Sequence, residues 1–220
     1  MDAALQRLVT VPQGPPAHPL VVKLGGSVVR GRQLANWLDV IADAKRPIVV
    51  VPGGGALADE VRQCQRQLGF DDDTAHRMAL LAMDQLAHAI AGLQTGFQVG
   101  ASDDDLRDTL GRGLVAVWAP SALIADRTDL EANWRLTSDS LALWLASRLG
   151  AGACYVVKSA PLARGAHSAT SLMREGIVDE AFPAMLAETG VRTEIFGRGE
   201  EAALAASLTQ EATPAGHLIE

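Results

Sequence analysis

Residues 20–27 read LVVKLGGS, a mostly apolar run of five residues followed by two glycines. A short apolar run that ends at turn-forming residues is typical of a buried strand, so we expect a strand over 20–24. The same pattern returns in PIVVVPGGG, which predicts a second strand over 47–51. Glycines at a strand end let backbone amides approach a ligand and form a nest for an anion. A tight strand-to-helix turn also explains each loop taken alone.

Apolar residues at helical spacing alternate with further short apolar runs along the chain. Helices are expected over 33–44, 56–68, 75–92, 102–110, a segment ending at 149, 179–188 and 199–208, and strands over 97–99, 114–118, 154–157, 191–196 and 217–219. Residues 159–176 show no strong period and are expected to form a mobile loop. This order predicts an α/β fold with a largely parallel sheet covered by helices on both faces. Ligands in such sheets bind at the carboxyl ends of the strands, where the two glycine loops and Lys158 would meet.

The composition limits the class of protein. The chain has 220 residues, of which 48% are hydrophobic and 20% are charged, as in ordinary globular proteins. This excludes a disordered chain, and the length suits one large domain or two small ones. The formal net charge of -7 argues against a nucleic-acid partner, because affinity for a phosphate backbone needs clustered Lys and Arg.

Lysine is rare in this chain. Of the 19 basic residues only Lys23, Lys45 and Lys158 are lysines. The planar guanidinium of Arg does not replace a compact ammonium group, so a lysine kept at a strand end is a candidate for binding a phosphate. The alternative explanation for the rarity of lysine is compositional drift, in which these three lysines remain by chance.

Signals for redox state and targeting are few. Cys64 and Cys154 stand outside metal-site spacings, which predicts reduced thiols, no metal site and a cytoplasmic location. Residues 1–19 lack the basic start and unbroken apolar core of a signal peptide, so we expect a loosely ordered leader. The apolar window 140–157 approaches the length of a membrane span, but Arg148 and two glycines interrupt it. No membrane partner is expected.

The stretch Thr137-Ser138-Asp139-Ser140 precedes an expected helix. All four residues are of types that cap helix N-termini, and capping is the favoured interpretation of the stretch taken alone. An aspartate close to two lysines could instead hold both ammonium groups in place, aimed at a phosphoryl group.

The common nucleotide motifs do not explain these features. The sequence contains no G-x-x-x-x-G-K-[ST] phosphate loop. Gly53, Gly55 and Ala58 satisfy the G-x-G-x-x-A pattern of dinucleotide-binding proteins, and Asp71 to Asp73 lie near the offset expected for a ribose contact. The residues before these aspartates have the pattern of a helix rather than of a second strand. A dinucleotide-dependent oxidoreductase is therefore the least favoured alternative.

Four stretches match one family in order: KLGGS, VPGGG, LTSDSLA and VVKSA. In this order the chain resembles the amino acid kinases, and its closing GHLIE is similar to a variant of their terminal segment. The stretches GGGALADEVR, AHRMALLAMDQ and WRLTSDSLALWLA resemble a small branch of that family, which phosphorylates (5-(aminomethyl)furan-3-yl)methyl phosphate in methanofuran biosynthesis. The acceptor in that branch is itself a phosphate monoester.

The resemblance implies a three-layer αβα sandwich formed by one domain over residues 20–220. Its acceptor lobe would span about 20–149 and its nucleotide lobe about 150–220. It implies a cytoplasmic homo-oligomer that uses ATP, with Mg²⁺ carried by the nucleotide. The catalytic residues would be Lys23, Asp139 and Lys158, and further phosphate or nucleotide contacts would come from Gly25, Gly26, Ser27 and Ser138.

The acceptor is expected at Gly53, Gly54, Gly55, Arg62, His76 and Asp84. A surface ion pair with Asp59 explains Arg62 equally well, because the two lie one helical turn apart. Core packing of the helix is the favoured explanation for His76 and Asp84, and pairing of Asp84 with a substrate amine is the functional one.

One departure from the family pattern stands out. After the later lysine the family usually continues to an Asp-Gly turn that shapes the nucleotide site, whereas this chain reads KSAPLARG from Lys158. A non-catalytic member that binds a nucleotide or another anion, as a regulator or a complex subunit, is therefore the main alternative to a kinase.

Overall fold

The computed structural model describes residues 18–31, 33–163, 165–209 and 215–220. Its centre is a seven-stranded sheet in the order β3-β4-β2-β1-β5-β6-β7. All neighbouring strands are parallel except β6 and β7, which confirms the predicted, largely parallel sheet. The strands are β1 (Leu20–Leu24), β2 (Ile48–Pro52), β3 (Phe97–Gly100), β4 (Val115–Trp118), β5 (Ala153–Val157), β6 (Thr193–Phe196) and β7 (His217–Leu218). Most of the expected leader, residues 1–17, lies outside the described residues.

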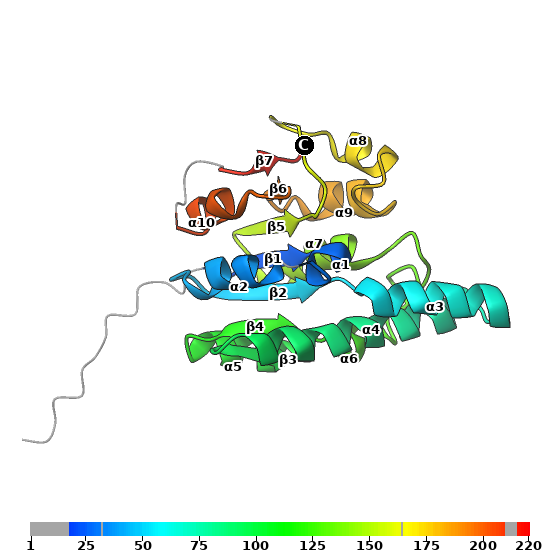
Figure 1. The fold of residues 1–220 in the computed structure, drawn as a ribbon. Coiled ribbons are helices and arrows are strands. Elements are labelled where there is room, and N and C mark those ends of the chain that lie inside the picture. Colours follow the sequence, from blue (N-terminus) through cyan, green and yellow to red (C-terminus); the bar gives the residue numbers. More distant parts are fainter. Residues whose placement is uncertain (1–17, 32, 164, 210–214) are drawn as a thin grey trace, which may run out of the picture.

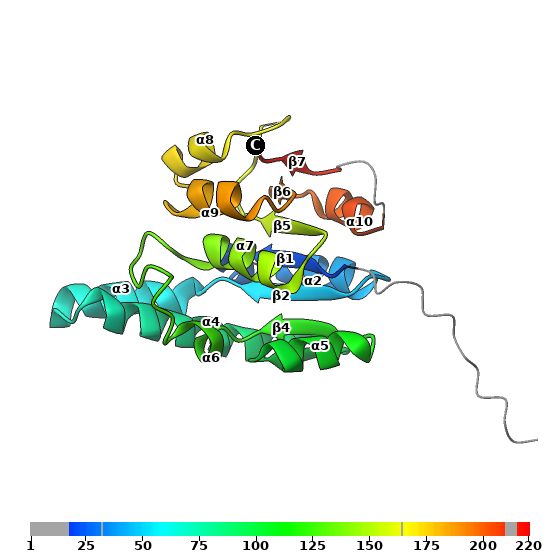
Figure 2. The same cartoon turned by 180° about the vertical axis from the view of Figure 1, so that it is seen from behind.

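Helices cover both faces of this sheet, so the predicted three-layer αβα architecture is confirmed (Figures 1 and 2). Alternate residues of the central strand point to opposite sides, with Val21 in one buried cluster and Val22 in the other. The helices are α1 (Gly26–Val29), α2 (Leu34–Ala42), α3 (Gly55–Leu68), α4 (Asp72–Leu93), α5 (Asp103–Gly111), α6 (Ser121–Ile124), α7 (Ser138–Leu149), α8 (Ala169–Arg174), α9 (Phe182–Thr189) and α10 (Glu201–Thr209). The α2 and α10 helices share one cluster, and α7 and α9 share the other.

The expected mobile loop over 159–176 is wrong in its second half. That half contains α8, and the start of this helix pairs with the end of the chain: the amide of Ala169 donates to the carbonyl of Glu220 at 2.8 Å. His167 forms a β-bridge with Ile219. Partners this far away in the sequence leave no local period, which explains why the pattern indicated a loop. The four-residue helices α1 and α6 were also not expected.

The order of the strands brings together the chain segments expected to bind phosphate. β1 lies between β2 and β5, with Lys23 paired in register with Val51 on one side and Val156 on the other. Because all three strands run in the same direction, the two glycine loops and Lys158 meet at one edge of the sheet.

Candidate active site

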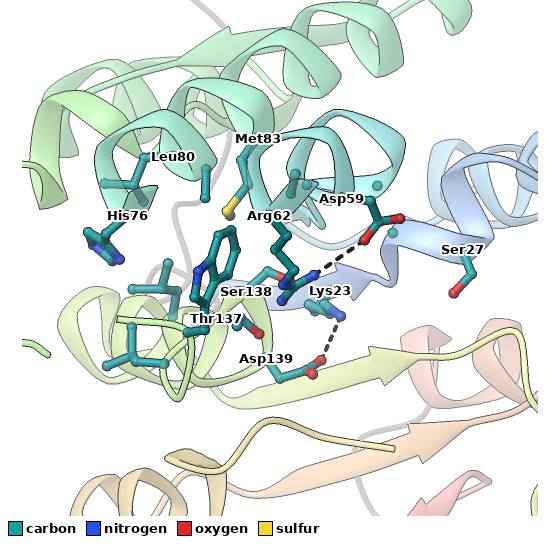
Figure 3. A pocket seen from close by; sticks show the side chains of 18 of the residues that line it. Lys23, Ser27, Asp59, Arg62, His76, Leu80, Met83, Thr137, Ser138 and Asp139 are labelled. Atoms are coloured by element: carbon teal, nitrogen blue, oxygen red, sulfur yellow. Dashed lines mark hydrogen bonds and ion pairs between the residues drawn. The ribbon is translucent and has the colours of Figure 1, made fainter. Parts of the chain in front are cut away.

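Asp139 stands between two lysines at this edge. Its Oδ1 lies 2.5 Å from Nζ of Lys23 (Figure 3). Its Oδ2 lies 2.7 Å from Nζ of Lys158. Lys23 is near the end of β1, Lys158 directly follows β5, and Asp139 lies in the first turn of α7. The structure thus brings together the three residues that were predicted to be catalytic.

The charges of this group depend on one another. Burial alone would raise the pKa of Asp139, but the ammonium groups of Lys158 and Lys23 outweigh it and lower that pKa to about 2. Burial also lowers the pKa of Lys158 to about 8; Asp139 opposes the shift and Lys23 adds to it. Asp139 is therefore ionised at neutral pH, whereas Lys158 changes its charge not far above it.

The capping interpretation of Thr137-Ser138-Asp139-Ser140 is corrected. No side chain of the stretch caps α7; the carboxylate of Asp179, just before α9, does so instead. It accepts from the amides of Thr137 at 3.0 Å and Ser140 at 3.1 Å. Asp179 was missed at the sequence level except as the start of an expected helix, because its partners lie about 40 residues away.

The glycines of the two loops first serve the packing of the loops against each other. A Cβ on Gly26 would lie 2.7 Å from the amide nitrogen of Gly55, and a Cβ on Gly53 would lie 2.5 Å from that of Gly26. Gly55 also has a positive φ of 53°. Contacts this short require glycine whether or not a ligand is bound.

Two of the predicted amide donors are already paired within the fold, which corrects their assignment. The Gly25 amide donates to the carbonyl of Val157 at 3.0 Å, and the Gly53 amide donates to that of Leu24 at 2.8 Å. The remaining residues of the two loops that were predicted to bind ligand, Gly26, Ser27, Gly54 and Gly55, line a pocket. Ser138 lines the same pocket.

This pocket has a volume of about 330 Å³ and opens above Lys23 and Asp139. Four basic side chains line it against two carboxylates, so its charged lining is net positive. The guanidinium carbon of Arg62 lies 4.1 Å from the centre of the Trp134 ring, and Arg62 also pairs with Asp59 at 3.3 Å. Arg30 binds the other oxygen of Asp59.

The far end of the pocket is less polar. His76 and Leu80, on α4, lie at the opposite side of the pocket from Ser27 and Asp59 (Figure 3). Burial lowers the pKa of His76, so its imidazole is neutral at pH 7. Among the described residues none forms a hydrogen bond with this ring, and His76 lines the pocket.

Asp84 does not line the pocket, contrary to its predicted role. Its carboxylate accepts a hydrogen bond from the Ser121 amide at 3.1 Å and so binds the start of α6. It follows Met83, which does face the pocket, and successive helical residues point about 100° apart.

The context expected of a dinucleotide site is absent from this part of the fold. Asp71 caps α4 by accepting from the Thr74 amide at 2.8 Å, and it follows helix α3 rather than a strand.

Cys64 and Cys154 are free thiols, and burial raises the pKa of Cys154 to about 12. None of the described helices is long and apolar enough to cross a membrane.

A model of the amino acid kinase family matches residues 19–161. The chain belongs to the amino acid kinase family. A curated relative, [5-(aminomethyl)furan-3-yl]methyl phosphate kinase of Methanocaldococcus jannaschii, is 29% identical over 133 residues. This alignment spans 59% of the present chain and 60% of the relative. It agrees with the resemblance to that branch of the amino acid kinases.

Solved structures share the amino acid kinase fold at low identity. Uridylate kinase from Archaeoglobus fulgidus superposes with a TM-score of 0.68 at 16% identity, over 91% of this chain and 99% of that one. Aspartate kinase from Synechocystis superposes with a TM-score of 0.63 at 15% identity, over 91% of this chain and 39% of that one. Identities this low support the fold alone.

Proposed function

We propose that this protein is a small-molecule kinase that transfers a phosphoryl group from ATP to an acceptor held in the pocket. The observation that carries the proposal is the single carboxylate of Asp139, which holds the ammonium groups of Lys23 and Lys158 at the base of a positively charged pocket. Phosphoryl transfer relies on positioning and charge stabilisation rather than on a strong general base, and these residues suit that task.

Each residue of the site then has a defined task. Lys23 and Lys158 stabilise the negative charge of the transferring group, and Asp139 keeps both aimed at it. Gly26, Ser27 and Ser138 would contact phosphate oxygens from the pocket wall. Mg²⁺ bound to ATP supplies further charge neutralisation. The described residues include no cluster of three or more His, Cys, Asp or Glu side chains suited to a metal ion.

The pocket favours an acceptor that already carries a phosphate. Beyond the two lysines and the aspartate between them, its charged lining consists of Arg30, Arg62 and Asp59, whose net positive charge suits an anionic group of the acceptor. Arg62, at the pocket wall, has the planar fork that binds phosphate oxygens in pairs. Gly54 and Gly55 lie beside it.

The same pocket has room for a flat, weakly polar group next to the phosphate. Trp134 lines the pocket with an aromatic ring, one face of which Arg62 covers, and His76 offers a neutral hydrogen-bonding group at the far end. We infer an acceptor such as an aminomethylfuran methyl phosphate, in the synthesis of a methanofuran-type cofactor. The name of the curated relative supports this choice.

The remaining expectations become part of the same proposal. The single domain would divide into an acceptor lobe over about 20–149 and a nucleotide lobe over about 150–220. We propose that the enzyme is a cytoplasmic homo-oligomer, with ATP and the acceptor as its small-molecule partners.

Binding without catalysis is the second candidate, and one observation favours it. Where the family has its Asp-Gly turn, Ala160 accepts a hydrogen bond from the Arg198 amide at 3.1 Å. A Cβ on the neighbouring Gly197 would lie 2.9 Å from the carbonyl oxygen of Ala160. This segment therefore packs against the end of β6, and a nucleotide would be bound without the family's usual turn.

The two candidates are separated by one pair of measurements. ATP binding is measured by calorimetry with and without Mg²⁺, and transfer of the γ-phosphate is then followed with [5-(aminomethyl)furan-3-yl]methyl phosphate and a panel of other phosphate monoesters. Transfer to any of them supports the kinase. Tight ATP binding without transfer to any acceptor supports the non-catalytic role.

A further inference from the structure

The first turn of α7 is fastened to a distant part of the chain by Asp179. Oδ2 of Asp179 accepts from the Thr137 amide, from the Thr137 hydroxyl at 2.8 Å, and from the Ser140 amide. Its Oδ1 accepts from the hydroxyl of Ser140. A second connection lies beside it, because the amide of Ala181 donates to the carbonyl of Arg135 at 2.9 Å.

This connection acts on the segment that carries Asp139. Lys23 lies in β1, which has a paired strand on each side. Lys158 directly follows β5, and its amide donates to the carbonyl of Phe196 at 2.8 Å. Asp139 instead projects from the start of a helix, and the amides at a helix start need an external partner. The position of Asp139 between the lysines therefore depends on what holds residues 137–140.

We propose that Asp179 is a positioning residue, which holds the first turn of α7 so that Asp139 stands between Lys23 and Lys158. This inference rests on the proposed phosphoryl-transfer site but not on the identity of the acceptor. Asp179 touches neither lysine; it acts through the backbone and hydroxyl groups of Thr137 and Ser140.

Asp179 also contributes charge to the site. The groups that act on Lys158 are Asp139 from α7, Lys23 from β1 and Asp179 from the segment before α9, and both carboxylates raise the pKa of Lys158. Removing the charge of Asp179 without disturbing its shape should therefore lower the pKa of Lys158 from its value of about 8.

Two variants separate positioning from charge. In Asp179→Asn the side-chain oxygen can keep the three bonds now made by Oδ2, and its amide can donate to the hydroxyl of Ser140. Asp179→Ala removes every one of these bonds. Ser102→Ala is the control, because Ser102 caps the start of a different helix, α5, and no residue of α5 lines the pocket.

The scarcity of lysine permits a direct readout that needs no turnover. Lysines labelled with ¹³C at Cε give signals from Lys23, Lys45 and Lys158, and Lys45→Arg helps to assign them. We expect Asp179→Asn to lower the titration midpoint of Lys158 with little change in the Lys23 signal. Asp179→Ala should shift the signals of both Lys23 and Lys158, and Ser102→Ala should leave these two signals unchanged.

Kinetics give the second readout. A misplacement of about 1 Å can cost about 100-fold in rate, so Asp179→Ala should lower kcat by a factor of this order, with a smaller change in the KM for ATP. Asp179→Asn should retain most of kcat at pH values below the lowered titration midpoint of Lys158. Unchanged lysine signals in both variants would overturn the inference whether or not the protein is a kinase. If the variants shift the lysine signals but the wild-type protein shows no turnover, the proposed kinase activity is rejected and the positioning role of Asp179 stands.

Discussion

Oδ2 of Asp139 lies 2.7 Å from the ammonium nitrogen of Lys158, although the two residues belong to different layers of the sandwich. Asp139 comes from a helix on one face and Lys158 from the end of a strand. The carboxylate of Asp139 therefore reaches from the helix to the sheet and holds in place the ammonium group that would bind the phosphoryl group.

The first prediction concerns Lys23 and Asp139. Removing one group that stabilises charge in a transition state typically costs about 100-fold in kcat or more, so Lys23→Met and Asp139→Asn should each lose at least about that much. Steady-state phosphate transfer measures the effect. Lys45→Met is the control, because Lys45 is exposed and does not line the pocket. Near-normal turnover in both pocket variants would reject their catalytic roles.

The second prediction is an alkaline limit to activity. Protonated Lys158 carries the useful charge, and its pKa of about 8 means that the charge is lost as the pH rises through that value. If only the protonated form is active, kcat/KM should fall about tenfold per pH unit above pH 8. Asp139, with a pKa of about 2, should produce no acidic limb above pH 4. A profile that stays flat to pH 10 would contradict the assignment.

The third prediction concerns the acceptor phosphate and Arg62. Hydrogen bonds to charged groups contribute about 1.5–3 kcal/mol, so Arg62→Ala should raise the KM for a phosphorylated acceptor by roughly 10- to 100-fold. The KM for ATP should stay the same. Arg62→Lys should not restore binding, because an ammonium lacks the planar fork. Arg107→Ala, on the exposed face of α5, serves as the control. An equal rise in the KM for ATP and in the KM for the acceptor would show that Arg62 does not bind the acceptor specifically.

The fourth prediction concerns the loop glycines. Gly53→Ala would bring a Cβ within 2.5 Å of the Gly26 backbone, and overpacking of this kind costs about 1–3 kcal/mol of unfolding free energy. Gly92→Ala, in α4 with open space around the new methyl group, should instead stabilise by about 0.5–1 kcal/mol. Denaturant unfolding compares the two. Equal stability of both variants would mean that the loops do not need their close contact.

The sequence was informative where structure is local. The apolar run that contains Lys23 and the one that precedes Lys158 predicted two strands, and the parallel order placed both strand ends at one edge. Asp139 was linked to these lysines by the resemblance to the amino acid kinases, because capping was the favoured interpretation of its stretch taken alone. The glycine loops were found because they directly follow two of the apolar runs, although the pattern did not reveal that Gly25 and Gly53 use their amides within the sheet.

Relations across the chain were not predictable in this way. The carboxylate of Asp179 reaches a helix about 40 residues earlier in the sequence, and the pairing of Ala169 with Glu220 orders a segment without any period. For Asp84 the error lay in the helix face. Its neighbour Met83 lines the pocket, but one step along the helix changes the direction of the side chain, so the carboxylate of Asp84 reaches α6 instead.

The pairing of β1 with β5 also has a consequence for how the protein folds. More than half of the chain lies between the two strands, yet they are direct neighbours in the sheet. Contacts between residues so far apart in the sequence form slowly, because the entropy cost of closing a long loop comes before the strand pairing contributes any stability. Lys23 and Lys158 therefore come together only when the two halves of the sheet have joined, and no fragment of the chain that lacks either strand can hold the pair.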